Sequence, residues 1–240
     1  MLGVSFDDLS LNAAVDRAMA LMEEHRSAYM VTPNPEIVIE SWKNKELAAA
    51  IEDAALVLPD GIGVVKAAKI LGTPLTERVP GIDTASGIFE RMAEQGKSAF
   101  LLGAKPGVAE KAAEFLLNKY DGLVICGTHD GYFKDDDPVV EQINAARPDF
   151  LLVCLGYPKQ ELWMRNNAPR LDVGLMAGLG GSLDVFAGVV DRAPEKWQRL
   201  GLEWLYRCVK EPKRIKRIAR LPLFLVKAAA KRIGKMFHGR

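Results

Sequence analysis

Cysteine, histidine and long apolar runs are scarce in this sequence, and each scarcity excludes a class of protein. Only three of the 240 residues are Cys and three are His, and both types are scattered along the chain. Their odd number and wide separation exclude a disulfide framework and a zinc site built on them, and favour a reducing compartment. No apolar run approaches the roughly 20 residues that cross a bilayer. The N-terminus lacks a cationic-then-apolar signal pattern, so we expect a cytosolic protein, free or bound to a membrane from that side.

The overall composition is that of an ordinary folded protein. Hydrophobic residues make up 49% of the chain and charged residues 26%, with 21 Gly and 13 Pro. These proportions exclude intrinsic disorder and collagen-like repeats. The length accommodates one large α/β domain.

The charge is distributed very unevenly, although the whole chain carries only +1. Residues 206–240 hold 12 of the 32 Lys and Arg residues but one of the 31 acidic residues, which gives this tail a net charge of +11. The remaining chain is therefore at −10. Such asymmetry predicts an anionic partner for the tail, namely phospholipid, nucleic acid or a phosphorylated substrate.

Short apolar runs alternate with helical patterns over most of the chain. The runs are expected strands at residues 3–6, 28–31, 55–58, 98–102, 123–126, 150–155 and 173–177, with helices between them that include 10–25 and 108–119. Nearly continuous apolar strands joined by helices predict a parallel sheet covered on both faces. The alternation stops near residue 194, which divides the chain into a predicted core (1–193) and a helical, basic appendage (194–240).

The loops that follow the expected strands hold the candidate functional residues, because ligands of open α/β sheets bind at the carboxyl ends of the strands. Asp60 ends one strand between Pro59 and Gly61. It is either a general base or the N-cap of the next helix. Thr32 and Asn34 present the same ambiguity after the first long run. The glycine-rich stretches 103–107 and 178–181 resemble phosphate-binding turns, but neither has the G-x-G-x-x-G spacing of a dinucleotide site.

Three consecutive acids, Asp135 to Asp137, are the strongest candidate for a metal site. They precede Pro138 and an expected helix, so we interpret them as N-terminal charges that the helix dipole favours. No metal site is therefore expected here.

The tail has an amphipathic pattern. Pro212 and Pro222 divide it into short helices, and from 223 to 237 the apolar and basic residues occupy opposite halves of a helix. Such a helix fits an anionic membrane surface. It fits a nucleic acid less well, since the apolar half would have no role there.

Seven short motifs, in this order, resemble those of the WecG/TagA/CpsF glycosyltransferases. They are residues 32–36 (TPNPE), 58–61 (LPDG), 77–81 (ERVPG), 127–133 (GTHDGYF), 155–161 (LGYPKQE), 180–184 (GGSLD) and 192–194 (RAP). Residues 203–207 (EWLYR) and 211–215 (EPKRI) are similar to the C-terminal appendage of that family.

The resemblance implies a Rossmann-like core and an inverting transfer of N-acetylmannosamine, without a metal or other cofactor. The donor would be UDP-N-acetylmannosamine. The acceptor would be undecaprenyl-diphosphate-linked N-acetylglucosamine, with a β-1,4 bond formed during synthesis of the teichoic acid linkage unit. Because this acceptor lies in the bacterial membrane, the resemblance also implies a peripheral enzyme on its cytoplasmic face.

The resemblance also implies roles for individual residues. Asp60 would be the general base, with Thr32 beside it in the pocket. Asn34, Arg78 and Gln160 would bind the sugar or the diphosphate. The remaining implied residues are Gly131, Tyr132 and Asp184 for the uridine, and Arg207, Arg214 and Arg217 of the appendage for the diphosphate.

Three other functions remain open at this point. A sister transferase could use another UDP-sugar, such as N-acetylmannosaminuronic acid or a hexose donor. A nucleotide-dependent oxidoreductase is disfavoured by the missing fingerprint. A non-catalytic membrane- or nucleic-acid-binding module would not need Asp60. The sequence also leaves open whether the chain is a monomer or a homo-oligomer.

Overall fold

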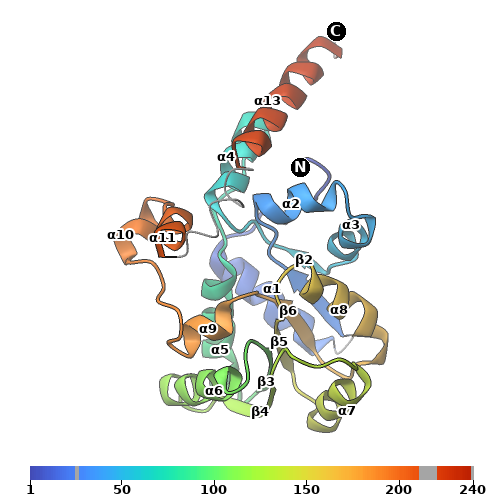
Figure 1. The fold of residues 1–240 in the computed structure, drawn as a ribbon, viewed down its shortest axis with the longest axis vertical. Helices are drawn as coiled ribbons and strands as arrows, with labels where there is room; N and C mark the ends of the chain where they lie inside the picture. The colour runs from blue at the N-terminus through green and yellow to red at the C-terminus, as the bar shows by residue number, and fades with distance from the viewer. Residues whose placement is uncertain (25–26, 211–220, 239–240) are drawn as a thin grey trace.

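A six-stranded parallel sheet forms the middle layer of the molecule. The computed structural model describes residues 1–24, 27–210 and 221–238 (Figure 1). The strands lie in the order β2-β1-β6-β5-β3-β4, and each neighbouring pair is parallel. Helices cover both faces, which confirms the predicted α/β, Rossmann-like class. The strands are β1 Ala28–Val31, β2 Leu56–Val57, β3 Ser98–Gly103, β4 Val124–His129, β5 Phe150–Cys154 and β6 Leu175–Gly178.

Successive strand residues point to opposite faces of the sheet, so two apolar clusters form. On one face, strand residues such as Met30, Leu101 and Ala177 pack against four helices. These helices are α1 Leu11–Glu23, α5 Gly81–Gln95, α6 Val108–Lys119 and α9 Ser182–Phe186.

The other face carries more helices. Val31, Leu102 and Met176 are among the strand residues in its cluster. The covering helices are α2 Pro35–Ser41, α3 Lys45–Glu52, α4 Ile62–Leu71, α7 Asp137–Ala146 and α8 Lys159–Asn167, the last followed by the 3-10 turn η1 Ala168–Arg170.

Within the described residues, the helices that come after α9 are α10 Glu195–Arg199, α11 Glu203–Lys210 and α13 Leu221–His238. The last of them runs along α4 and beyond it, so that its C-terminal end extends past the body of the molecule (Figure 1). Phe224 and Ala228 are fully buried in the second cluster. The expected helix at 213–220 lies outside the described residues. None of the helices in the described ranges is long and apolar enough to cross a membrane.

The structure corrects three expectations from the sequence. Residues 3–6 form no strand; instead the neighbouring Asp7 joins the edge of β2, where its amide donates to Val57 O at 2.9 Å and its carboxylate accepts from Val57 N at 2.7 Å. β4 continues through the GTH residues expected in a loop. Helix α13 begins before Pro222, which occupies its first turn and does not interrupt it.

Candidate functional site

A cavity of about 250 Å³ lies past the carboxyl ends of β1, β2 and β6. Thr32, which follows β1, lines it together with Asp60 from the loop after β2 and Leu179 after β6. Gly81 lets the chain pass close to this wall, because a Cβ atom there would lie 2.8 Å from Leu179 Cδ2 and 3.2 Å from Thr32 Oγ1. The cavity thus lies at the sheet edge where parallel α/β proteins bind ligands.

Four helices, α2, α4, α5 and α9, begin at residues that line the cavity. Asn34 caps α2: its Oδ1 accepts hydrogen bonds from the amides of Glu36 and Ile37 at 2.9 and 3.1 Å. No side chain caps the first turn of α4, whose residues Ile62 and Gly63 line the cavity. Helix N-termini carry partial positive charge and free amides, so this arrangement favours a negatively charged ligand.

Asp60 lines the cavity and is half-buried. Of the two interpretations of its role, the N-cap is wrong, because the N-cap position of α4 belongs to Gly61. Gly61 has φ +93°, a conformation that disfavours other residues, and it turns the chain between the carboxylate and the helix. Asp60 therefore stands at the cavity wall beside a helix N-terminus, where a carboxylate is stabilised electrostatically.

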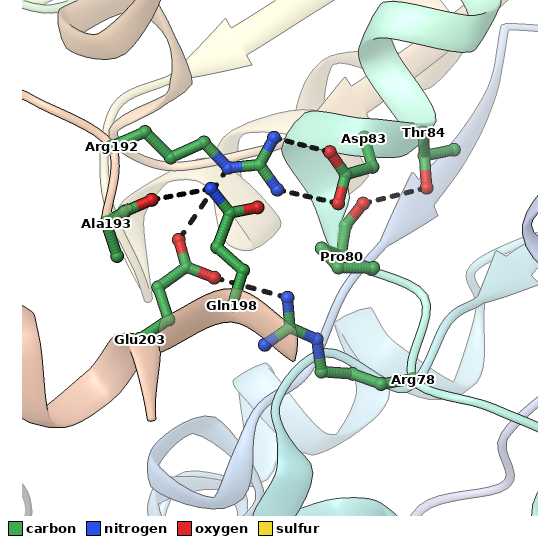
Figure 2. Close-up of polar contacts among 8 residues, drawn as sticks. All are labelled: Arg78, Pro80, Asp83, Thr84, Arg192, Ala193, Gln198 and Glu203. Atoms are coloured by element: carbon green, nitrogen blue, oxygen red, sulfur yellow. Dashed lines mark hydrogen bonds and ion pairs between the residues drawn. The ribbon is translucent and has the colours of Figure 1, made fainter. Parts of the chain in front are cut away.

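An ion-pair network connects the cavity to the start of α11 (Figure 2). Arg78, which lines the cavity, donates from Nη2 to Glu203 Oε2 at 3.2 Å. Arg192 holds Asp83 with two nitrogens, Nη1 to Oδ1 at 2.6 Å and Nη2 to Oδ2 at 2.7 Å. Arg192 Nε lies 4.0 Å from Glu203 Oε1. Glu203 thus stands between two arginines, one in the cavity wall and one behind it.

The pKa of Arg192 reflects this surrounding of carboxylates. Burial acts to lower the pKa of the guanidinium, but the hydrogen bond to Asp83 and the charges of Asp83, Glu203 and Asp60 outweigh burial and raise it. Asp60 is therefore close enough to this network to interact with it electrostatically.

Acidic side chains outnumber basic ones in the described lining of the cavity. Glu36, Asp60 and Glu203 are acidic, and Arg78 is the one basic residue in that described lining. Glu36 accepts a hydrogen bond from the hydroxyl of Tyr157. A doubly charged ligand would therefore need positive charge from helix N-termini and from side chains beyond this lining.

Gln160 lies beside the cavity and supports its glycine turn. The residue is buried, its Oε1 accepts from Gly180 N at 2.9 Å, and its Nε2 donates to Glu161 Oε1 at 2.9 Å. Glu161 is itself buried, and its Oε2 has no hydrogen-bond partner among the described residues. Burial raises the pKa of Glu161, against the opposing effect of the Gln160 hydrogen bond.

The residues implied for uridine lie further along the same edge of the sheet. Gly131 follows β4, and its amide donates to Ala104 O at 2.9 Å while its carbonyl accepts from Lys159 Nζ at 3.2 Å. Tyr132 next to it is 69% exposed. Asp184 lies in the first turn of α9, and its carbonyl accepts from Val189 N at 2.9 Å. None of these residues belongs to the described lining, which groups only Thr32, Asn34, Asp60 and Arg78 from the predicted set.

The three appendage arginines are not placed by the described structure. Arg207 belongs to α11, but its side chain is outside the described part of the chain. Arg214 and Arg217 lie outside the described residues. Their predicted contacts with a diphosphate therefore remain predictions.

The acidic run before α7 makes structural contacts. Asp136 accepts from Asn167 Nδ2 at 3.0 Å, and Asp137 pairs with Arg170 at 2.5 Å. Across the described ranges, no group of three or more His, Cys, Asp or Glu is placed to hold a metal ion.

Sequence reasoning missed Glu203, Arg192 and Trp204. Glu203 and Trp204 line the cavity from α11, although the sequence identified them only as members of an appendage motif. Glu203 pairs with a residue 125 positions earlier in the chain, in a different motif. The only indication in the sequence was that the two motifs that contain these residues, 77–81 and 203–207, both resemble motifs of the same family.

The comparisons with known proteins agree with this geometry. A family model described as the WecG/TagA/CpsF family of glycosyl transferases matches residues 1–237. The chain belongs to this family. The resemblance seen in the motifs is thereby confirmed.

Two relatives with the same name are similar to this chain over most of its length. The chain is 37% identical over 204 residues to the N-acetylglucosaminyldiphosphoundecaprenol N-acetyl-beta-D-mannosaminyltransferase of Bacillus spizizenii, a match that covers 85% of this chain and 79% of that protein. A protein of the same name from Staphylococcus aureus (strain MW2) is 35% identical over 231 residues, which cover 95% of this chain and 91% of the relative.

Proposed function

We propose that this protein transfers N-acetylmannosamine from UDP-N-acetylmannosamine to undecaprenyl-diphosphate-linked N-acetylglucosamine, with inversion at the anomeric carbon. The observation that carries the proposal is the cavity at the sheet edge, because it brings together residues of three separate motifs, namely Thr32 and Asn34, Asp60, and Arg78. The names of the relatives supply the substrates.

Asp60 is the proposed general base. Inverting transfer needs one group that removes the proton of the acceptor hydroxyl while the bond from the sugar to UDP breaks. Asp60 follows strand β2 and stands at the cavity wall beside the start of α4, which places its carboxylate at the ligand-binding edge of the sheet.

Arg78 and the helix N-termini at the cavity are proposed to stabilise the departing diphosphate. A planar guanidinium can donate two parallel hydrogen bonds to phosphate oxygens, and free helix amides favour negative charge. Since acidic groups prevail in the described lining, we further propose that Arg207, Arg214 and Arg217 supply the missing positive charge. Under this proposal the reaction needs no metal ion.

Helix α13 is the proposed membrane contact. Its residues Leu223, Val226 and Ile233 are 49%, 63% and 54% exposed, and their spacing places them with Ala230 on one helix face. The opposite face carries the buried Phe224 and packs on α4. A docked helix with an outward apolar stripe and neighbouring lysines can lie in the headgroup region of an anionic membrane. Such a contact would put the enzyme on the bacterial cytoplasmic membrane, at its cytoplasmic face.

A UDP-release assay tests the proposed reaction. Purified protein is incubated with a lipid-diphosphate-linked N-acetylglucosamine analogue and a panel of UDP-sugars, and released UDP is measured with and without the acceptor. The proposal expects acceptor-dependent release with UDP-N-acetylmannosamine. Release with a different UDP-sugar would instead identify a sister transferase, and no release with any donor would contradict a transferase function.

A further inference from the structure

Glu203 is the residue on which the two arginines of the network converge. It is the first residue of α11, and its side chain is only 11% exposed. One carboxylate oxygen accepts from Arg78 Nη2 at 3.2 Å, and the other lies 4.0 Å from Arg192 Nε. Among the described residues Arg78 is held through Nη2, so the guanidinium has further N–H groups that can donate to a ligand.

Arg192 differs from Arg78 because its position is already fixed. Its two terminal nitrogens form paired contacts with Asp83 on the first turn of α5, at 2.6 and 2.7 Å. Its third nitrogen, Nε, is buried and has no hydrogen-bond partner among the described residues. A buried donor without an acceptor is costly, and the nearest carboxylate oxygen stands only about 1 Å beyond ordinary hydrogen-bond distance.

We propose that the ion pair between Glu203 and Arg78 is exchangeable. When the donor binds, Arg78 leaves Glu203 and binds the diphosphate, and the carboxylate of Glu203 then binds Nε of Arg192. This inference rests on the proposed function, because it assumes that Arg78 binds the diphosphate. The sequence motifs contained Glu203 without giving it a role, and the proposal gives it a positioning role that acts through Arg78.

The electrostatics of the cavity favour such an exchange. A diphosphate on Arg78 would lie next to the carboxylate of Glu203, and two anions in a partly buried site repel each other strongly. A shift of Glu203 toward Arg192 relieves this repulsion and supplies the acceptor that Arg192 Nε lacks. Neither charge is then left buried without a partner, which is the costly alternative.

The exchange also connects the ligand to the appendage. Glu203 and Trp204 are consecutive residues of α11, and both line the cavity. A movement of the Glu203 carboxylate therefore changes the wall that α11 contributes. Donor binding and the position of α11 become coupled through one side chain.

Calorimetric titration with UDP and with uridine tests the exchange. In Glu203→Gln the competing charge is gone, so we expect UDP to bind three- to tenfold more tightly, with uridine affinity unchanged. Glu195→Gln is the matched control, since Glu195 lies in the same C-terminal segment and pairs with Arg199 on the surface. It should leave both affinities at wild-type values.

Arg192→Lys tests the binding of Glu203 to Arg192, and it should change UDP affinity in the opposite direction. Lysine retains the positive charge but has one nitrogen where the guanidinium has three. It cannot bind Asp83 with two nitrogens and offer a third to Glu203, so UDP should bind several-fold more weakly. In the double variant with Glu203→Gln this loss should disappear. Because Arg192→Lys leaves Glu203 in place, it still tests the exchange in the event that Glu203→Gln does not fold.

Two results would overturn the inference. Weaker UDP binding in Glu203→Gln would mean that Glu203 only orients Arg78. Equal changes for UDP and uridine would mean that the diphosphate is not involved. Arg78→Ala distinguishes these two results from a failure of the proposed function. If UDP affinity does not fall in that variant, then Arg78 does not bind the diphosphate, and the proposed role of Arg78 and the exchange with Glu203 are both wrong.

Discussion

The ring of Phe224 on α13 stacks on the ring of Trp42 at the end of α2, with centroids 6.4 Å apart and planes 15° from parallel. Phe224 has no exposed surface. Two turns further on, Arg232 donates from Nη1 to the carbonyl of Leu71, the last residue of α4, at 3.2 Å. A cation near helix C-terminal carbonyls is favourable, so α13 is fixed to the core by an apolar and a polar contact.

Phe224→Ala should lower the free energy of unfolding by about 3–5 kcal/mol, because it leaves a cavity between α13, α2 and α4. Val226→Ala on the exposed side of α13 should change it by less than about 0.5 kcal/mol. Urea unfolding followed by circular dichroism measures both. A loss under 1 kcal/mol for Phe224→Ala would mean that α13 does not contribute to the cooperative core.

Asp60→Asn should reduce turnover by about 10²–10⁴-fold, the usual cost of removing a general base, while UDP affinity changes little. The measurement is UDP release at saturating donor and acceptor, together with UDP titration. Asp53→Asn is the control, since Asp53 pairs with Arg165 on the surface. Activity of Asp60→Asn within a few-fold of the wild type would remove Asp60 from the role of base.

Glu161 should make the stability of the protein depend on pH. Because burial raises its pKa in the folded state above the ordinary value of 4.5, the protonated form is favoured on folding. Its contribution is fully present below pH 4.5 and is lost as pH rises through the folded-state pKa. Glu161→Gln should therefore be more stable than the wild type at pH 8, with the difference shrinking toward pH 5.

Urea unfolding of both proteins between pH 5 and pH 8 checks this sign. Glu114→Gln, at an exposed position of α6, provides the comparison and should show no such trend. A Glu161→Gln difference that is constant over the pH range would indicate a packing effect without titration.

The sequence predicted elements well where local pattern and tertiary packing agree. The bounds of β1 and α6, and the capping of α2 by Asn34, match the expectations. The GTH stretch of β4 was expected in a loop because of its glycine. In the structure Gly127 faces Phe100 of β3, and a Cβ atom there would lie 2.4 Å from that ring. This glycine therefore belongs to the strand for a packing reason that only the neighbouring strand reveals.

The candidate site was predictable only in part, for a related reason. Motif residues at strand ends could be assigned to one sheet edge, since parallel strands share it. Their grouping could not be predicted, because Gln160 turns inward to Gly180 while Arg78 reaches a residue of α11. Likewise the amphipathic pattern of the tail could not tell which apolar side chains are buried: Phe224 is fully buried and anchors the helix, whereas Leu223 and Val226 are exposed.

The exposed stripe of α13 gives the last prediction. Replacing Leu223, Val226 and Ile233 together by Gln should abolish sedimentation with anionic vesicles, since each apolar side chain contributes about 1 kcal/mol or more when it enters the headgroup region. Unfolding free energy should stay near the wild-type value because these side chains are exposed. Deleting the helix is a poorer test, since it also removes the buried Phe224 and Ala228.

A matched control variant carries the same number of Gln substitutions at exposed apolar residues elsewhere. Leu117, Val124 and Val189 are 46%, 46% and 55% exposed on other elements, and their replacement should leave sedimentation intact. Wild-type binding should also weaken with added salt, because Lys227 and Lys231 beside the stripe act through screened charge. If the stripe variant sediments like the wild type, then α13 is not the membrane contact. Loss of sedimentation in both variants would mean that the vesicles bind exposed apolar side chains without regard to their place on the protein.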